Sequence, residues 1–312
     1  MDLTEFGTPT GPMTRVGGGA ANRLYRLDTD RGSFAVKELN LVDRRWPYHL
    51  EDVFRFEQAA FAAGIPMPES MAAGPDLLVH RWVDGAKLPE APAPPAYAFE
   101  LGQILARLHA LDFDWPHEPS REPTPRDWPE LAERAAATGQ PWADELAAKV
   151  DTFLAIADFV DTCERPGPVV LTHQDLQPWN LLVRDGRPVL LDWELSGRLD
   201  LSGELGSTAL GLCKGPGLDH LEPASFRAVL DGYVAGGGTL PPPGPSWFVF
   251  TVSGRLGHIR ANLVRCLAGV EAGTGPDLAQ SQQIVRAGLH GLPDLFRRLP
   301  DLEALLLEAL SA

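Results

Sequence analysis

The sequence predicts an α+β chain of two lobes, a small N-terminal β-sheet lobe with one helix and a larger, mainly helical C-terminal lobe. With 312 residues, 44% of them hydrophobic, the chain is long enough to bury the cores of two lobes. Short alternating runs fill residues 1–83, whereas helical periodicity dominates residues 84–312. The proline-rich stretch "KLPEAPAPPA" separates the two patterns.

In the first lobe, "RLYRLDTDRGSFAVKEL" alternates and bends at Asp30-Arg31-Gly32, which predicts two paired strands. "HLEDVFRFEQAAFAAG" has the apolar spacing of a helix that ends at Gly64. "DLLVHRWVDG" predicts a further strand, and the glycine-rich "RVGGGAAN" precedes the strand pair. These segments together indicate a sheet with one helix.

In the second lobe, "YAFELGQILARLHALD" predicts a strongly amphipathic helix. The dipeptide Asp185-Gly186 lies between two apolar runs and is the two-residue turn signal of a β-hairpin. Further helices are expected at residues 129–136, 143–163, 203–213, 223–235, 247–269, 277–290 and 301–310.

Composition narrows the functional classes. A net charge of −15 disfavours nucleic acid as a partner, because phosphate backbones need a basic surface. No apolar run is long enough to span a membrane, and the N-terminal residues lack the pattern of a signal peptide. Three cysteines (Cys163, Cys213 and Cys266) without CxxC spacing indicate the cytoplasm and argue against a structural zinc site.

The charge is concentrated in the second lobe. Residues 84–312 carry 18 basic and 31 acidic side chains, with Glu194 among the acids available to a ligand. This excess favours a cationic small-molecule substrate, although acidic surfaces also simply keep proteins soluble.

The predicted hairpin brings chemical groups together. Pairing outward from the turn sets Leu181 opposite Leu190, so that Asn180 and Asp192 converge just beyond the strands. An amide oxygen and a carboxylate are hard ligands suited to Mg²⁺. Asp175 precedes Asn180 by five residues, in a loop, where it could accept a proton from a hydroxyl. Protein kinases divide these tasks in the same way.

The stretch "HQDLQPWN", followed by "LLDWE", resembles the aminoglycoside phosphotransferase and choline kinase superfamily. The signature of that superfamily is His-Gly-Asp-x-x-x-x-Asn followed by an Asp-Trp or Asp-Phe pair. "LGQILARLHAL" and "AAGIPMPE" are also similar to parts of this family, so the resemblance spans most of the chain. It implies a bilobal protein-kinase-like fold that binds ATP (or GTP) and Mg²⁺ and phosphorylates a hydroxyl of a small molecule.

The resemblance also implies roles for individual residues. Asp175 would be the catalytic base, Asn180 and Asp192 would bind Mg²⁺, and His173 would brace the loop. Lys37 would hold the α- and β-phosphates. Lys37 has independent support, because it lies in an apolar alternation of a chain with only 4 lysines and 23 arginines, and a buried lysine needs an anionic partner.

Other nucleotide contacts are expected in the first lobe. Glu57, rather than Glu51, is predicted to pair with Lys37. The hinge that meets the adenine is expected around His80 to Val83, and the glycine-rich loop would touch the phosphates. The residues expected to bind the nucleotide are therefore Lys37, Glu57, Gly17, Gly18, Gly19, Arg81, Trp82 and Val83.

Some positions depart from the family pattern or serve packing. Gln174 replaces the usual glycine of the signature, and Glu204 stands where the family usually has an aspartate at a helix start. His109, Trp179 and Trp193 are expected to pack rather than to contact ligands.

The substrate remains open at this stage. Candidates are an aminoglycoside or other cationic antibiotic, which would imply antibiotic resistance, an amino sugar, and an amino-alcohol such as choline. The main alternative is an inactive nucleotide-binding pseudokinase, which the joint presence of Lys37, Asp175, Asn180 and Asp192 disfavours. A protein kinase is a weaker alternative, because the sequence has no Asp-Phe-Gly or Ala-Pro-Glu.

Overall fold

The computed structural model describes residues 3–16, 22–39, 49–88, 92–119, 123–215, 218–272 and 278–311. The chain divides into two compact units. The first comprises Met1–Pro119, Val169–Leu199 and Thr208–Leu240, and the second comprises Ser120–Pro168, Asp200–Ser207 and Pro241–Ala312. Every predicted site residue that the structure describes belongs to the first unit, except Glu204.

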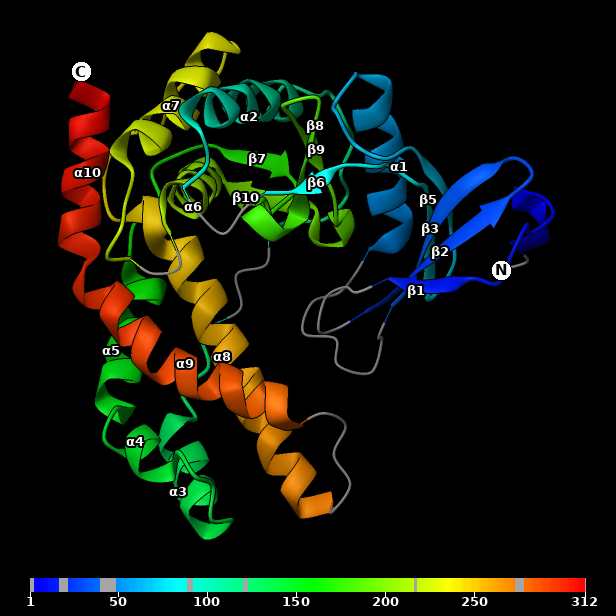
Figure 1. Ribbon diagram of the computed structural model, residues 1–312. Helices are drawn as coiled ribbons and strands as arrows, with labels where there is room; N and C mark the ends of the chain where they lie inside the picture. The colour runs from blue at the N-terminus through cyan, green and yellow to red at the C-terminus, as the bar shows by residue number, and fades with distance from the viewer. Residues whose placement is uncertain are drawn as a thin grey trace. The chain divides into compact units, whose positions relative to one another are not determined.

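The N-terminal part of the first unit is a five-stranded antiparallel sheet with the strand order β1-β2-β3-β5-β4 (Figure 1). The predicted strand pair is confirmed, since β2 and β3 pair in register as far as Thr29 opposite Gly32. Gly32 takes a φ of 123°, which side chains disfavour. The strands are β1 (Thr14–Val16), β2 (Arg23–Thr29), β3 (Gly32–Glu38), β4 (Ser70–Ala73) and β5 (Leu77–Arg81).

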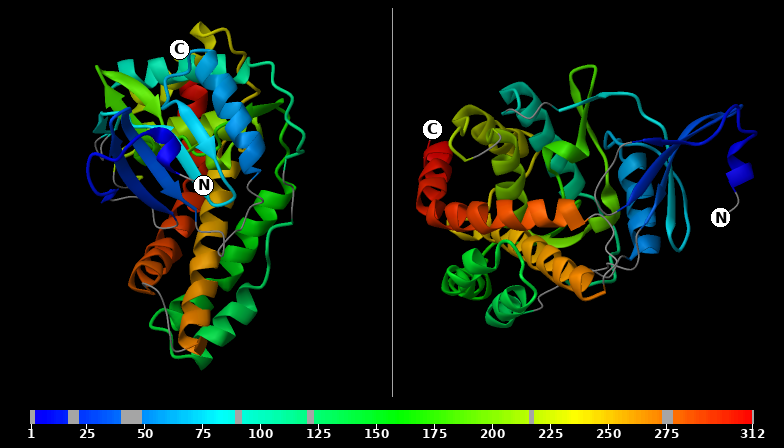
Figure 2. Two further views of the ribbon diagram at one scale, coloured as in Figure 1. Left: turned by 90° about the vertical axis from the view of Figure 1, so that its right-hand side faces the viewer. Right: turned by 60° about the horizontal axis from the view of Figure 1, so that its bottom comes forward.

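Alternation along β3 gives the sheet two different faces. Phe34 and Val36 are buried in a cluster on one face. Lys37 points to the other face, where it lies opposite Leu78 of β5. Helix α1 (Leu50–Ala62) covers this second face, with its first residue packed on Leu78 (Figures 1 and 2). The lysine is therefore held on the helix-covered face of the sheet.

Helices α2 (Pro95–His109) and α7 (Pro223–Ala235) pack very closely within the first unit. A Cβ atom on Gly102 would lie 2.1 Å from the carbonyl oxygen of Val229, and one on Gly232 would lie 2.0 Å from that of Phe99. The two backbones touch at these glycines, so a larger residue at either position would force the helices apart.

The predicted hairpin is confirmed in position and register. Leu181 pairs with Leu190, and the turn residues Asp185 and Gly186 have φ values of 53° and 80°, as a type I′ turn requires. The sequence did not predict the strands that surround the hairpin. The hairpin strands are β8 (Leu181–Arg184) and β9 (Arg187–Leu190), and the strands not predicted are β6 (Ala86–Lys87), which pairs with β8, and β7 (Val169–Thr172) and β10 (Gly197–Asp200), which pair with each other.

The second unit consists mainly of helices, among which α8 and α9 run side by side (Figures 1 and 2). The single helix expected at residues 143–163 is wrong, because two helices with a break at Ala148 and Lys149 occupy this range. Helix α6 (Leu201–Cys213) begins in this unit with Glu204 buried in its first turn. The other helices are α3 (Trp128–Ala137), α4 (Ala143–Ala147), α5 (Val150–Thr162), α8 (Ser246–Ala272), α9 (Leu278–Arg297) and α10 (Leu299–Ser311).

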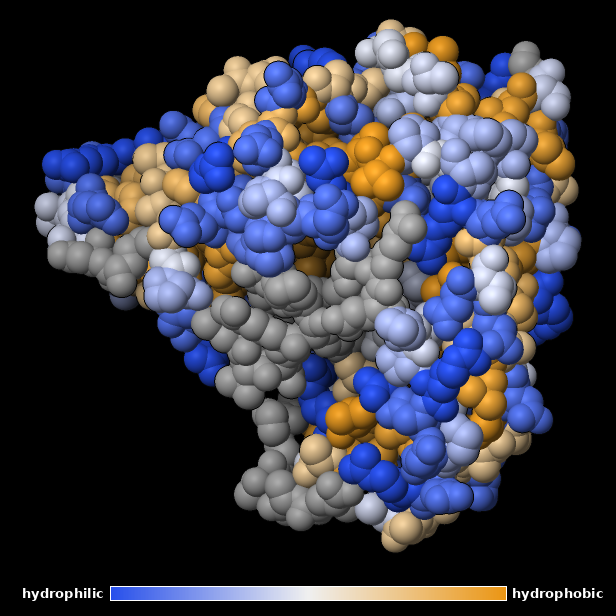
Figure 3. Space-filling view, turned by 180° about the vertical axis from the view of Figure 1, so that it is seen from behind, coloured by the Kyte–Doolittle hydropathy of each residue, from blue (hydrophilic) through white to orange (hydrophobic). Residues whose placement is uncertain are grey.

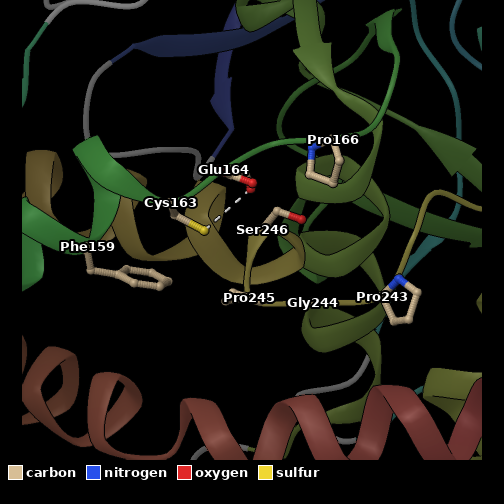
Figure 4. A pocket seen from close by; sticks show the side chains of 8 residues that line it. All are labelled: Phe159, Cys163, Glu164, Pro166, Pro243, Gly244, Pro245 and Ser246. Carbon is tan, nitrogen blue, oxygen red and sulfur yellow. Dashed lines mark hydrogen bonds between the residues drawn. The ribbon is translucent and has the colours of Figure 1, made fainter.

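A hollow of about 350 Å³ lies in the second unit where α5 ends and α8 begins. Phe159, Cys163 and Ser246 line it together with several prolines (Figure 4). None of the predicted site residues lines this hollow.

Hydrophilic side chains cover much of the face shown in Figure 3, and hydrophobic ones form scattered groups among them. No helix in the described ranges combines the length and the apolar character that crossing a membrane would require.

Candidate active site

The loop predicted to carry the catalytic base, residues 173–180 (the catalytic loop), follows strand β7 and begins with a buried histidine. The His173 ring accepts the backbone N–H of Asp175 through Nδ1 at 3.3 Å, and its Nε2 lies 2.7 Å from the carbonyl oxygen of Leu191. Burial lowers the pKa of His173 to about 4, so the ring is neutral and donates through Nε2. This one side chain ties the loop to the segment that follows the hairpin.

Two residues of the site adopt the left-handed backbone conformation. Gln174 has a φ of 65° and Asp192 a φ of 73°. This conformation costs a non-glycine residue roughly 1–2 kcal/mol, which explains why the related signature has glycine at the position of Gln174. The Gln174 side chain donates to the carbonyl oxygen of Arg198 at 3.2 Å and so gains a contact that glycine could not make.

Asp175 and Asn180 are joined inside the loop. The Asn180 side-chain amide donates to the Asp175 carboxylate at 2.7 Å and to its backbone carbonyl at 2.9 Å. The amide nitrogen is thereby used, which leaves Oδ1 of the buried Asn180 as the atom that could bind a cation. Burial raises the pKa of Asp175 to about 6, against the lowering effect of the Asn180 hydrogen bond.

Lys37 lies between two acids that follow the second strand of the hairpin. Its ammonium group donates to the carboxylates of Asp192 and Glu194, residues 155 and 157 positions further along the chain. The Lys37 side chain is 12% exposed and that of Glu194 is 7% exposed, whereas Asp192 is 40% exposed. The same lysine and Glu194 act electrostatically on Asp175, so these groups form one site.

The sequence did not predict that Glu194 lies in this site beside Lys37. Burial is the largest influence on the pKa of Glu194 and acts to raise it, but the charge and the hydrogen bond of Lys37, together with smaller lowering effects, hold the pKa below its usual value. Asn22 donates to Oε1 at 2.9 Å, while the buried Oε2 has no hydrogen-bond partner among the described residues. A second acid two positions after Asp192 was the available signal.

The predicted Lys37–Glu57 pair is not formed in this structure. Glu57 is fully buried on α1, where its Oε2 accepts from Ser70 at 2.6 Å and lies 3.0 Å from His80 Nε2. Ser70 and His80 are cross-strand partners in β4 and β5, so the sheet presents both to the same carboxylate. A local polar cluster holds Glu57, and Glu194 takes the place predicted for it beside Lys37.

The hinge residues predicted to meet the adenine include the end of β5 and the two residues that follow it. The Arg81 guanidinium lies 4.8 Å from the Phe34 ring, on the sheet face opposite Lys37. The Trp82 backbone N–H donates to Ser33, and its indole donates to Asp84 at 2.8 Å.

The remaining predicted nucleotide contacts differ in how far the structure describes them. Val83 lines a hollow of about 290 Å³ beside the hairpin turn. Gly17, Gly18 and Gly19 lie outside the described residues.

The two tryptophans that flank the site differ sharply. Trp193 is 2% exposed and packs between His173, at 4.7 Å between ring centroids, and Phe56 of α1, at 5.9 Å. Its predicted packing role is confirmed. The same expectation for Trp179 is wrong, because this residue is 62% exposed.

His109 belongs to a buried hydrogen-bonded group beneath the loop. Its two ring nitrogens lie 3.1 Å from the Tyr233 hydroxyl and 3.0 Å from the Thr172 hydroxyl. Burial lowers the pKa of His109 to about 3, so the ring is neutral. Thr172 directly precedes His173, so this group connects helices α2 and α7 to the start of the catalytic loop.

The donor set suits a hard divalent cation. Asn180 and Asp192 offer oxygen atoms, and the unpartnered Oε2 of Glu194 is a further buried oxygen close by. Over the described residues, no group of three or more His, Cys, Asp or Glu could hold a metal by itself.

The N-terminal sheet with its helix, the lysine on β3 and the loop-plus-hairpin segment define a protein-kinase-like fold. The chain belongs to the phosphotransferase enzyme family, whose model matches residues 12–248. A comparison with curated proteins gives no match.

Solved structures of low sequence identity share the fold. Choline kinase from Cryptosporidium parvum is 13% identical, with a TM-score of 0.61 over 95% of this chain and 91% of that one. A spectinomycin phosphotransferase in complex with ADP and spectinomycin is 13% identical, with a TM-score of 0.60 over 88% of each chain. An amicoumacin kinase with AMP-PNP and Ca²⁺ is 14% identical, with a TM-score of 0.60 over 93% and 90%.

Proposed function

We propose that this protein transfers the γ-phosphoryl group of ATP, or GTP, to a hydroxyl of a small cationic molecule in the cytoplasm. The observation that carries the proposal is the meeting of Lys37 with Asp192 and Glu194, electrostatically coupled to Asp175 in the catalytic loop. A buried lysine, two carboxylates and a separate base are the groups that phosphoryl transfer requires. Membership of the phosphotransferase family supports this reading.

Each residue has a role that follows from its surroundings. Asp175 would orient the acceptor hydroxyl and take its proton, with Asn180 fixing one carboxylate oxygen. Lys37 would leave its carboxylate partners and bind the α- and β-phosphates. Asn180 and Asp192 would hold Mg²⁺, which when bound neutralises charge on the phosphates.

In this proposal residues 1–83 form the nucleotide-binding lobe and residues 84–312 the catalytic and substrate-binding lobe. The hinge at Arg81, Trp82 and Val83 and the glycines 17–19 would contact the nucleotide from the first lobe. The neutral His173 would act as a brace and not as a base, because both of its nitrogens already have partners.

We also propose a chemical class for the acceptor molecule. Related folds include proteins described as acting on choline and spectinomycin, both of them cationic hydroxyl compounds. The acidic surplus of residues 84–312 is compatible with an aminoglycoside-type antibiotic, an amino sugar or an amino-alcohol.

A coupled ATP-consumption assay over these acceptors, with Mg²⁺, tests the proposal. Asp175→Asn keeps the shape of the side chain but removes the base, so turnover should fall about 10²- to 10⁴-fold while nucleotide binding persists. Asp192→Ala should abolish the Mg²⁺ dependence of nucleotide binding in a thermal-shift titration. Consumption that is equal in wild type and Asp175→Asn would refute the catalytic assignment and leave a nucleotide-binding pseudokinase.

A further inference from the structure

Helix α8 of the second unit carries three arginines, and two of them have clear partners (Figures 1 and 2). Arg260 donates to both carboxylate oxygens of Asp127, at 2.7 and 2.6 Å. Arg265 donates to the side-chain oxygen of Asn262 at 2.9 Å. Arg255 makes no hydrogen bond or ion pair with any residue that the structure describes. The same helix therefore pairs two guanidinium groups and leaves the third without a counter-charge.

The surroundings of Arg255 do not compensate its charge. The residue is partly buried, and burial lowers the pKa of its guanidinium with no opposing effect from a charge among the described residues. On Arg260, in contrast, the hydrogen bond with Asp127 raises the pKa. A guanidinium cannot lose its proton inside a protein, so Arg255 stays charged and its lost hydration is not replaced. An uncompensated charge of this kind indicates a site for an oppositely charged ligand.

Thr251, one turn before Arg255, offers a second unused polar group. Its Oγ1 is buried and has no hydrogen-bond partner among the described residues. Residues four apart on a helix lie on the same face, and a long side chain leans toward the N-terminus of its helix, so the Arg255 side chain is directed toward Thr251. A buried hydroxyl without a partner destabilises the fold, as an unpaired charge does. Two groups that both lack partners therefore lie at one place on α8.

The backbone that carries these two residues is fixed by close packing on either side along α8. Phe250 packs on Gly203 of α6, where an added Cβ would lie 2.9 Å from the Phe250 Cβ. Ile259 packs on Gly288 of α9, where an added Cβ would lie 2.4 Å from the Ile259 Cγ1. Each guanidinium nitrogen of Arg255 nevertheless keeps some contact with solvent, since none is fully buried. A small ligand can therefore reach a group that the helix holds in place.

We propose that Arg255 and Thr251 form a binding site for an oxyanion, which is a carboxylate or phosphate group of a small molecule. The planar guanidinium can donate two parallel hydrogen bonds to either group, and the Thr251 hydroxyl can donate a third. Both residues lie beyond residues 12–248, the part of the chain that the family model matches. The site uses no residue of the candidate active site, so it does not depend on the proposed phosphotransfer.

Differential scanning fluorimetry with sodium phosphate or sodium acetate, against sodium chloride of equal ionic strength, tests the site. For a Kd of about 1 mM, an anion at about 20 mM should raise the Tm of the wild type by about 3–4 °C. Arg255→Met keeps a long apolar side chain but removes the unpaired charge. Its Tm without phosphate or acetate should therefore lie about 2–4 °C above that of the wild type, and most of the anion-induced shift should be lost. A larger wild-type shift with phosphate than with acetate would indicate a phosphate group, and the reverse a carboxylate.

Three further variants separate anion binding from folding. Thr251→Val removes only the hydroxyl, so it should reduce the anion-induced shift without lowering the Tm in sodium chloride. Arg260→Met breaks the pair with Asp127 on the same helix, so it should lower the Tm and keep the anion-induced shift. Arg286→Met, at an exposed arginine of α9, is the matched control and should change neither quantity.

Three outcomes would overturn the inference. An equal anion-induced shift in wild type and Arg255→Met would show that the anion binds elsewhere or stabilises the protein through the solvent. A wild type whose Tm responds to neither anion would show that the site does not bind oxyanions. A lower Tm of Arg255→Met in sodium chloride would show that the guanidinium stabilises the fold. None of these results bears on the proposed function, which is tested separately by the turnover of Asp175→Asn.

Discussion

Replacing Lys37 with methionine should destabilise the ligand-free protein strongly, in a way that depends on Glu194. Glu194 is 7% exposed and Lys37 is 12% exposed, so the substitution leaves a carboxylate buried without its counter-charge. Breaking a buried pair from one side costs about 3–5 kcal/mol. At about 2 °C per kcal/mol for a chain of this size, the Tm should fall by about 6–10 °C. The contact with Asp192 adds little, because that side chain is 40% exposed and screened by water.

The loss should also depend on pH. In the wild type, Lys37 holds the pKa of Glu194 below its usual value, so the pair stabilises the fold at neutral pH and loses this contribution as the pH falls through the lowered pKa. In Lys37→Met both lowering effects of the lysine are lost, so burial, the largest influence, should raise the pKa of Glu194. The Lys37→Met variant is therefore destabilised at neutral pH, and it recovers stability as the Glu194 carboxyl becomes protonated at lower pH.

Differential scanning fluorimetry at pH 7.5 and pH 5, without metal or nucleotide, measures this effect. Lys37→Met/Glu194→Gln should recover most of the lost Tm at pH 7.5, because no buried charge is left unpaired. Lys87→Met, at an exposed lysine, is the matched control and should leave the Tm within about 1 °C of the wild type. An unchanged Tm in Lys37→Met, or no recovery in the double variant, would refute the reasoning.

Three further outcomes are expected. The acceptor kcat/KM should fall about tenfold per pH unit below pH 6, where Asp175 becomes protonated, and a flat profile between pH 5 and 6 would contradict its role as base. Gly102→Ala should lower the Tm, at a cost of about 1–3 kcal/mol, because its Cβ would lie 2.1 Å from Val229 O, whereas Gly254→Ala, with no atom within 4 Å, should not lower it. Glu194→Gln should weaken nucleotide binding more than Glu57→Gln does, as measured by isothermal titration with Mg²⁺; the reverse order would restore Glu57 as the partner of Lys37.

The hairpin could be predicted because its information is local. Asp185-Gly186 can adopt the positive φ angles of a type I′ turn, and the alternation around it admits one register only. That register alone places Asn180 next to Leu191, whose N–H donates to the Asn180 carbonyl at 2.9 Å. The position of Lys37 on a strand could also be predicted, because its apolar neighbours alternate as in a strand.

The partner of Lys37 could not be predicted from the sequence in the same way. Choosing Glu57 required the rotation of α1 and the polar groups around it, and His80 and Ser70 reach it from strands whose register is set by tertiary pairing. Trp179 and Trp193 are equally apolar as residue types. Only the packing of Phe56 and His173 around Trp193 distinguishes the buried ring from the exposed one.

The Lys37 contacts have a consequence for the order in which ligands bind. In this structure its ammonium group serves as the counterion of Asp192 and Glu194. A divalent cation that binds alone would displace the Lys37 ammonium group from the two carboxylates and leave it without an anionic partner. A cation that binds together with a nucleotide also brings phosphates, to which Lys37 can bind. Binding of the metal and binding of the nucleotide should then promote each other by the same factor. Lys37 thus lowers the affinity of the site for a metal ion alone and favours binding of the metal–nucleotide complex.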